Sequence, residues 1–293
     1  MEQAILKTLI YADLFDYPLT RAELWRRLIW EKQLAPSKRD FEATLKRLEK
    51  NSKVLKRIEQ GREYYFLPGR EAMVKRRRRR EGEARRKLEK AGRIVKFLRL
   101  CPWVWLIGVS GSVAAGNARP GDDIDLFVVT APRRLWLTRL WLVLTLELLG
   151  QRRRPQARQI KNKFCLNLLI SADQLAYFSQ ERNLFLAHEL RQLQVLFHRH
   201  NTYYQLLWVN RWVKQFLPNW PPRSWPAKYF SSPLPRGLVW DWGERLAYWF
   251  QRQWMARRRT RERVEPFLAA FHPRDLSRLV LTRFSRRCRH FQL

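Results

Sequence analysis

Short apolar segments and one long apolar segment follow one another in the middle of the chain. Residues 103–107 and 126–129 predict two buried strands, and residues 163–170 predict a third. Between the second and third strands, the apolar run Leu135–Leu149 has the length of a helix that crosses over a sheet. Residues 100–172 are therefore predicted to form a core of strands and helices.

The N-terminal 70 residues show helical spacing followed by two strands. The apolar residues of a first helix recur at three- and four-residue steps: Ile5, Leu6, Leu9, Ile10 and Leu14. A second helix begins at Thr20-Arg-Ala-Glu23, which has the form of a capping box, and a third begins near Ser37. Residues 54–58 and 64–67 predict two strands on either side of a turn. Three helices and a hairpin are expected here.

Charged and helical segments make up the rest of the chain. Residues 71–99 read as a basic, mostly helical connector, with the run Lys75-Arg-Arg-Arg-Arg-Arg80, and Gly82 and Gly92 are positions where this helix can bend. The apolar spacing after residue 172 is helical through Leu196, and a Pro- and Trp-rich stretch interrupts it at 217–235. The expected organisation is an N-terminal domain at 1–70, the connector at 71–99, the core at 100–172 and a helical C-terminal region at 173–293.

Composition narrows the choice of partners. The chain has 59 Lys and Arg against 26 Asp and Glu, and a formal net charge of +33 attracts DNA or RNA, although an Arg-rich proteome gives the same excess without a nucleic-acid role. Three cysteines far apart in the chain fit neither a disulfide framework nor a zinc cluster. No signal-peptide pattern begins the chain, so we expect a cytoplasmic protein. The apolar run at 135–149 is shorter than the ~20 residues of a transmembrane helix, so no membrane partner is expected.

The residues that indicate chemistry flank the first two predicted strands. Gly108-Val-Ser-Gly111-Ser112 follows the first strand, and Asp123-Ile-Asp125 opens the second. Gly111 lets the backbone come close to a ligand, and its amide can donate to phosphate oxygens together with the hydroxyl and amide of Ser112. Asp123 and Asp125 occupy alternate positions, so both carboxylates project from one face of an extended backbone. Two hard oxygen ligands beside a phosphate suit Mg²⁺.

A purely structural interpretation of the same residues stays open. Asp and Gly are common in turns, and Arg119-Pro-Gly-Asp122 has the composition of a turn that precedes a strand. A lone Asp-x-Asp is more often solvated than catalytic. The Gly-Ser turn at a fitting distance before the acidic pair favours a nucleotide or phosphate site.

At these residues the chain resembles the DNA polymerase beta type nucleotidyltransferase superfamily, whose signature is a Gly-Ser turn followed by Asp-x-Asp on a strand. It looks most like bacterial proteins known only by their nucleotidyltransferase domain. The resemblance covers roughly residues 100–172. It implies an α/β (α+β) fold with a small mixed sheet, and up to two Mg²⁺ ions on Asp123 and Asp125. It also implies transfer of a nucleoside monophosphate from a nucleoside triphosphate to an acceptor that it does not identify.

One residue departs from the pattern of the superfamily. Active members add a third carboxylate from a later strand, and the residue at the corresponding place here is Asn167, which carries no charge and cannot take up a proton. Asp173 follows the strand but also fits the capped start of a helix. We expect Asn167 to line the nucleotide site and Lys163 to contact phosphates. Whether the substitution abolishes activity is left open.

The N-terminal helices and hairpin resemble a winged-helix domain. In a DNA-binding winged helix the third helix enters the major groove, and its basic residues would contact phosphates and bases. The candidates are Lys38, Arg39, Lys46, Arg47 and Lys50. Winged helices also serve as protein-interaction modules, so the partner of this region, DNA or protein, is left open.

These observations give three hypotheses for function. The first is a metal-dependent nucleotidyltransferase in which Asp123 and Asp125 bind Mg²⁺ while Gly111 and Ser112 hold the triphosphate. The second is a catalytically inactive regulator, built on the same fold, that binds nucleic acid. The third is an interaction scaffold whose basic surface keeps it soluble or attached to an assembly.

Overall fold

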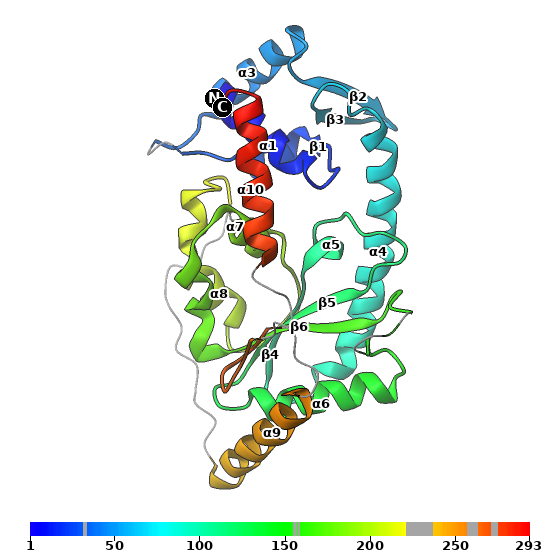
Figure 1. Cartoon of the computed structure of the whole chain (residues 1–293), viewed down its shortest axis with the longest axis vertical. Helices are drawn as coiled ribbons and strands as arrows, with labels where there is room; N and C mark the ends of the chain where they lie inside the picture. The colour runs from blue at the N-terminus through cyan, green and yellow to red at the C-terminus, as the bar shows by residue number, and fades with distance from the viewer. Residues whose placement is uncertain (32–33, 155–156, 158, 221–236, 257–262, 271–274) are drawn as a thin grey trace.

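The computed structural model describes residues 1–31, 34–154, 157, 159–220, 237–256, 263–270 and 275–293 (Figure 1). Most of the Pro- and Trp-rich stretch at 217–235 lies outside these residues. No helix within these described ranges is both long and apolar enough to cross a membrane.

Six described strands form a mixed sheet in the middle of the molecule (Figure 1). They are β4 (Val104–Val109), β5 (Ile124–Thr130), β6 (Phe164–Ser171), β7 (Gln194–His198), β8 (Arg263–Glu265) and β9 (Leu268–Ala270). Their order is β7-β4-β5-β6-β9-β8. β5 and β6 are parallel and are joined through α6 (Leu135–Leu148), whereas the other neighbours are antiparallel. The predicted central strands, the crossover helix and the mixed α/β fold are therefore confirmed.

Helices cover both faces of this sheet. On β5, Leu126 and Val128 face a core shared with α4 (Ala72–Leu98), α6 and α9 (Leu238–Ala256), whereas Phe127 and Val129 face the opposite core. That opposite core contains α7 (Leu184–Gln192), α8 (Thr202–Val209), α10 (Asp275–His290), and the 3₁₀ segments η1 (Ala172–Glu181) and η2 (Arg211–Gln215). Because side chains alternate along a strand, the odd-numbered positions of β5 point toward α7 and η1.

The region after residue 172 is less helical than the sequence predicts. The expectation of helical spacing through Leu196 is wrong, because β7 begins at Gln194 and pairs with the edge of β4. β9 pairs in turn with β6. Over a few residues, apolar spacing fits a strand as well as a helix, and here pairing with an exposed sheet edge decides between them.

The N-terminal region folds as three helices and a small sheet. Its elements are α1 (Glu2–Asp13), β1 (Leu19–Thr20), α2 (Arg21–Arg26), α3 (Lys38–Lys50), β2 (Leu55–Glu59) and β3 (Arg62–Phe66). The capping box is present, since the Glu23 amide donates to the Thr20 hydroxyl and the Thr20 amide donates to the Glu23 carboxylate. Gln60 and Gly61 both have positive φ, which a two-residue hairpin turn requires. The predicted helices and hairpin are confirmed, and β1 adds an edge strand to β3 that the sequence did not indicate.

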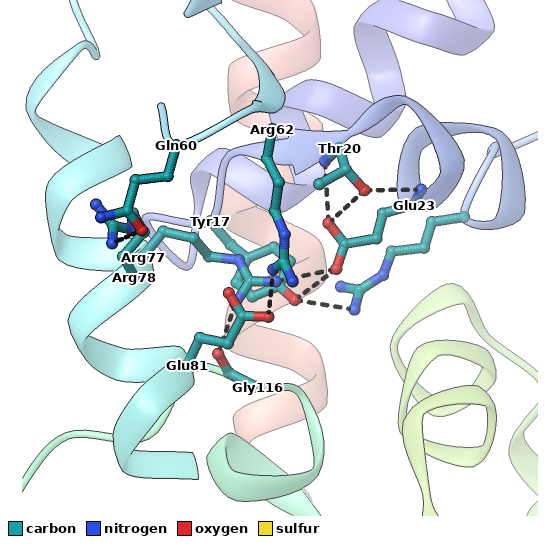
Figure 2. A network of polar contacts seen from close by, with 10 residues as sticks. Tyr17, Thr20, Glu23, Gln60, Arg62, Arg77, Arg78, Glu81 and Gly116 are labelled. Atoms are coloured by element: carbon teal, nitrogen blue, oxygen red, sulfur yellow. Dashed lines mark hydrogen bonds and ion pairs between the residues drawn. The ribbon is translucent and has the colours of Figure 1, made fainter. Parts of the chain in front are cut away.

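α4 connects the N-terminal region to the sheet as one continuous helix (Figure 1). It passes through Gly82 and Gly92 without a break in the helix. The Arg77 side chain within its basic run is buried and donates to the carbonyl of Gly116 at 2.9 Å and to Glu23 at 3.0 Å (Figure 2). Its guanidinium also lies over the ring of Tyr17, 3.9 Å from the centroid. Part of the basic run therefore ties the N-terminal region to the loop after α5 (Gly111–Ala114).

Candidate active site

The turn after β4 lies against the start of β5. The Ser110 amide donates to the carbonyl of Asp125 at 2.9 Å, and Gly111 then adopts a φ of +65°. A Cβ atom at Gly111 would lie 2.9 Å from the Asp125 Oδ2 atom, closer than such contacts allow. Glycine is therefore favoured at this position, because it tolerates the left-handed backbone and leaves room for the carboxylate.

Two carboxylates and a thiol converge beside this turn. Ligand atoms of Asp123, Asp125 and Cys165 all lie within 4.8 Å of one another. Ile124 between the two acidic residues is fully buried on the other side, so the expected alternation holds. Cys165 joins the group because β5 and β6 are parallel and in register, with Asp125 opposite Cys165. No sequence pattern indicated this position, since a cysteine in an apolar strand reads as packing.

Burial and charge give the cluster unusual electrostatics. Burial, followed by the adjacent Asp123, raises the pKa of Asp125 to about 7. Burial also raises the pKa of the Cys165 thiol to about 12, so it stays protonated at neutral pH. Asp123 is held differently, because the Arg153 guanidinium donates to its Oδ2 atom at 2.6 Å. The site thus contains one carboxylate paired with a cation of the protein and one that resists ionisation.

The Ser112 hydroxyl is engaged with a third acidic residue. It donates to Asp122 Oδ2 at 2.8 Å, and the same oxygen accepts the Arg119 amide at 2.9 Å. The Asp122 amide in turn donates to the Arg119 carbonyl at 3.2 Å, which confirms the turn predicted for residues 119–122. In this arrangement the Ser112 side chain stabilises the loop that contains Asp122. The first backbone amides of α5 have no intrahelical acceptor, as at the start of any helix.

Lys163, Asn167 and Asp173 are the remaining residues that the sequence singled out around this sheet. The Lys163 ammonium donates to the carbonyl of Gly150 at 2.5 Å. Asn167 lies where the β5–β6 register shifts, and it lines an apolar cavity together with Ser110. Asp173 is exposed at the start of η1 and does not belong to the cluster. β6 therefore places Cys165, not a carboxylate, beside Asp125.

Glu189 is the acidic residue that the sequence analysis did not select. It lies on α7, lines the same cavity as Asn167, and its charge contributes to the raised pKa of Asp125. Burial raises the pKa of Glu189 itself to about 7. Its helical context gave no signal, because only the packing of α7 on the sheet brings it toward β5.

Comparison with known proteins agrees with this geometry. Residues 88–196 match the family model of the nucleotidyltransferase domain. The matched segment begins within α4, includes the turn and the carboxylate cluster, and ends in β7. No curated protein matches the chain significantly. Residues 88–196, which include Asp123 and Asp125, are thus similar to a nucleotidyltransferase domain.

Proposed function

We propose that this protein transfers a nucleoside monophosphate from a nucleoside triphosphate to an acceptor, with Mg²⁺ held by Asp123 and Asp125. The observation that carries the proposal is the contact between Gly111 and Asp125. A side chain at residue 111 would collide with the carboxylate, so a backbone turn and an acidic pair share one small space. A polyphosphate and its cation need backbone amides and carboxylates at such close range.

The chemistry of the donor atoms supports a hard cation. Asp123 and Asp125 offer carboxylate oxygens, which Mg²⁺ prefers, while Cys165 offers a protonated thiol that is a poor ligand for it. When bound, the cation neutralises charge on the phosphates as the α-phosphate is attacked. Arg153 lies on the outer side of Asp123 and adds a second positive charge at the same place.

The residues of the chain then orient the substrate. Backbone amides at Gly111 and Ser112 hold phosphate oxygens, while the Ser112–Asp122 hydrogen bond keeps the turn in shape. The acceptor atom forms a bond to the α-phosphorus, and the bond from that phosphorus to the bridging oxygen breaks. Pyrophosphate leaves with the electron pair, and the proton of the acceptor passes to a base. Such a reaction needs positioning and charge neutralisation more than covalent catalysis.

Calorimetric titration with a non-hydrolysable triphosphate tests the proposal. Wild-type protein should bind the analogue with Mg²⁺ present, and EDTA should abolish binding. Asp123→Asn combined with Asp125→Asn should abolish it as well, whereas Asp173→Asn, which changes an exposed carboxylate outside the cluster, should not. Equal binding by the double variant and the wild type would refute the metal site. Transfer of label from an α-labelled triphosphate to a component of a cell extract would then identify the acceptor.

A nucleic-acid-binding regulator on the same fold is the second candidate. It is favoured by a groove between the β2–β3 hairpin and α4, where five of the ten described lining residues are basic: Arg62, Lys75, Arg78, Arg79 and Arg85. The basic residues proposed on α3 of this winged-helix-like region are also exposed. This function predicts DNA or RNA binding that weakens steeply with salt, together with no turnover of any triphosphate.

A further inference from the structure

An apolar cavity adjoins the carboxylate cluster on the same face of the sheet. Its volume is about 200 Å³. Phe127, two positions after Asp125 on β5, forms part of its wall, and Ser110, directly before Gly111, forms part of its rim. The other walls come from aromatic and aliphatic side chains of η1, β6 and α7, among them Leu168, Tyr177, Phe178 and Phe185. The cavity therefore begins where the proposed triphosphate site ends.

Two buried polar atoms face this cavity without a hydrogen-bond partner among the described residues. They are Ser110 Oγ and Asn167 Oδ1. A buried acceptor left unpaired costs free energy, so each of these atoms needs a partner, a ligand or a water molecule, inside the cavity. Asn167 Oδ1 only accepts hydrogen bonds, which means that its partner must carry an O–H or N–H group.

The charge of the lining contrasts with the charge of the chain. The chain has a net charge of +33, yet none of the described residues that line the cavity is Lys or Arg. The charged side chains described there are Glu181 and Glu189. Nucleic acids bind through phosphate contacts with Lys and Arg, so this lining does not suit a polyanion.

We propose that the cavity binds the acceptor, and that the acceptor is a small molecule with an apolar or aromatic body and a terminal hydroxyl or amine. This inference rests on the proposed nucleotidyl transfer. The terminal group hydrogen-bonds to Asn167 and Ser110, its oxygen or nitrogen forms the bond to the α-phosphorus, and pyrophosphate departs. The proton of the attacking group passes to the carboxylate of Glu189, which lines the same cavity. Burial keeps the pKa of that carboxylate at about 7, close to the value that suits a base at neutral pH.

Binding of three probes of similar size tests the cavity. 2-Phenylethylamine and 2-phenylethanol should bind in saturation-transfer NMR, and phenylacetate should bind about tenfold more weakly because it places an anion near Glu189. Leu186→Trp, which fills the cavity, should remove binding of both neutral and cationic probes, whereas Leu144→Trp on the exposed face of α6 should not. Equal binding of phenylacetate, displacement of the probes by a DNA oligonucleotide, or probe binding unchanged in Leu186→Trp would overturn the proposal.

Titration with the triphosphate analogue and Mg²⁺ separates this proposal from the previous one. The Leu186→Trp variant should bind the triphosphate analogue like the wild type but should no longer bind the probes. If wild-type protein binds the probes but not the analogue, nucleotidyl transfer fails and the cavity is a binding site of another kind. If the analogue binds and no probe does, the transfer proposal stands and the acceptor class is wrong. Glu189→Gln should lower the rate of label transfer without weakening probe binding, with Glu181→Gln as its control.

A different observation concerns α9, which presents its polar side to the protein. Glu244 and Gln251 are both 9% exposed. The Glu244 carboxylate accepts the amides of Trp136 and Leu137 at 2.7 and 2.9 Å, at the start of α6. Gln251 donates to the Trp136 carbonyl at 2.9 Å and accepts from Arg139 at 2.5 Å. These hydrogen bonds fix the orientation of α9.

The outward side of α9 is apolar and aromatic. Its side chains recur at helical spacing with large exposed fractions: Val239 79%, Trp242 70%, Leu246 64%, Trp249 56% and Phe250 67%. The neighbouring α6 also exposes Trp141, Leu144 and Leu148. Apolar groups gathered in this way are uncommon on a free surface and mark a place of interaction.

Positive charge accompanies these aromatic side chains. Arg245 lies 5.9 Å from the ring of Trp242, and Arg252 lies 5.8 Å from the ring of Tyr248. The two acidic residues of α9 do not oppose them, because Asp241 is paired with Arg134 at 2.6 Å and Glu244 is buried. Tryptophan and arginine on one helix suit the boundary between lipid headgroups and acyl chains, and the net charge of the chain favours anionic headgroups.

We infer that α9 lies in the plane of an anionic lipid surface with Trp242, Leu246 and Trp249 inserted. Sedimentation with vesicles tests this mode of binding. Wild-type protein should sediment with vesicles that contain phosphatidylglycerol and much less with phosphatidylcholine alone, and its tryptophan emission should shift to the blue. Trp242→Ser with Trp249→Ser should weaken binding about tenfold or more.

Control substitutions distinguish binding through α9 from nonspecific hydrophobic adsorption to vesicles. Ile58→Ser with Phe97→Ser removes exposed apolar side chains elsewhere at the same net charge and should sediment like the wild type. Equal sedimentation of the α9 double variant and the wild type would overturn the inference. A second result would also overturn it: no vesicle binding, together with light scattering that shows a dimer in the wild type and a monomer in the α9 double variant. A second copy of the chain would then cover this face.

Discussion

The Arg153 guanidinium donates to the Asp123 carboxylate at 2.6 Å, so a cation of the protein occupies one of the two proposed metal ligands. The Arg153 side chain is 34% exposed and the Asp123 side chain 13%. The ion pair therefore lies at the mouth of the site, where Arg153 can turn from the carboxylate to a phosphate oxygen.

Arg153→Gln should strengthen the binding of Mn²⁺ in the absence of nucleotide, because Arg153 competes with the cation for Asp123. A partly exposed pair contributes up to about 1 kcal/mol, which corresponds to an affinity a few times higher. The same substitution should weaken binding of the triphosphate with metal, since a phosphate contact is lost. Calorimetry measures both. Arg154→Gln, which breaks a pair with Glu147 outside the cluster, should change neither affinity.

Gly111→Ala should remove binding of the triphosphate with Mg²⁺. The new methyl group would meet Asp125 Oδ2 at 2.9 Å and displace the carboxylate. Gly150→Ala is the matched control, because Gly150 has a similar φ of +62° but open space around its Cβ position. Both variants should lose about 1–2 kcal/mol of unfolding free energy through backbone strain. If Gly111→Ala still binds the triphosphate, the close contact between the turn and the Asp125 carboxylate is not needed for binding.

The stability of the metal-free protein should fall as the pH rises toward neutrality. The pKa of Asp125 is raised from 3.8 to about 7 in the folded protein, so folding favours the protonated form. This contribution is fully present below the pKa of the unfolded chain and is lost as the pH passes about 7. Asp125→Asn should therefore give a flatter dependence of Tm on pH across this window, measured with EDTA present, whereas Asp173→Asn should follow the wild type.

Arg77→Met should destabilise the fold more than any exposed substitution in the basic run. Arg77 joins Glu23, Tyr17 and the Gly116 carbonyl in one buried network (Figure 2). Its loss leaves Glu23 without its nearest cation, at a cost of about 3 kcal/mol in the free energy of unfolding. Arg85→Met, which breaks only an exposed pair with Glu89, should cost less than about 0.5 kcal/mol. Denaturant titration compares the two, and equal losses would show that Arg77 is not structural.

The sequence predicted most of the local structure. Two-residue alternation placed Asp123 and Asp125 on one face, and helical spacing with a capping box located the N-terminal helices. The connector was predicted as a helix and is one. These features depend on neighbours within a few residues, which periodicity records. The strand at β7 was missed because it exists only through pairing with β4.

The sequence by itself thus determined the N-terminal helices and hairpin, the central strands β4, β5 and β6, and which two carboxylates share a face. Tertiary structure alone decided that Cys165 lies opposite Asp125, that Arg153 pairs with Asp123, and that Glu189 reaches the cavity beside them. It also decided that α9 buries Glu244 and exposes its tryptophans. The physical reason is that strand register and burial depend on contacts between residues far apart in the chain. No local pattern of polarity encodes such contacts.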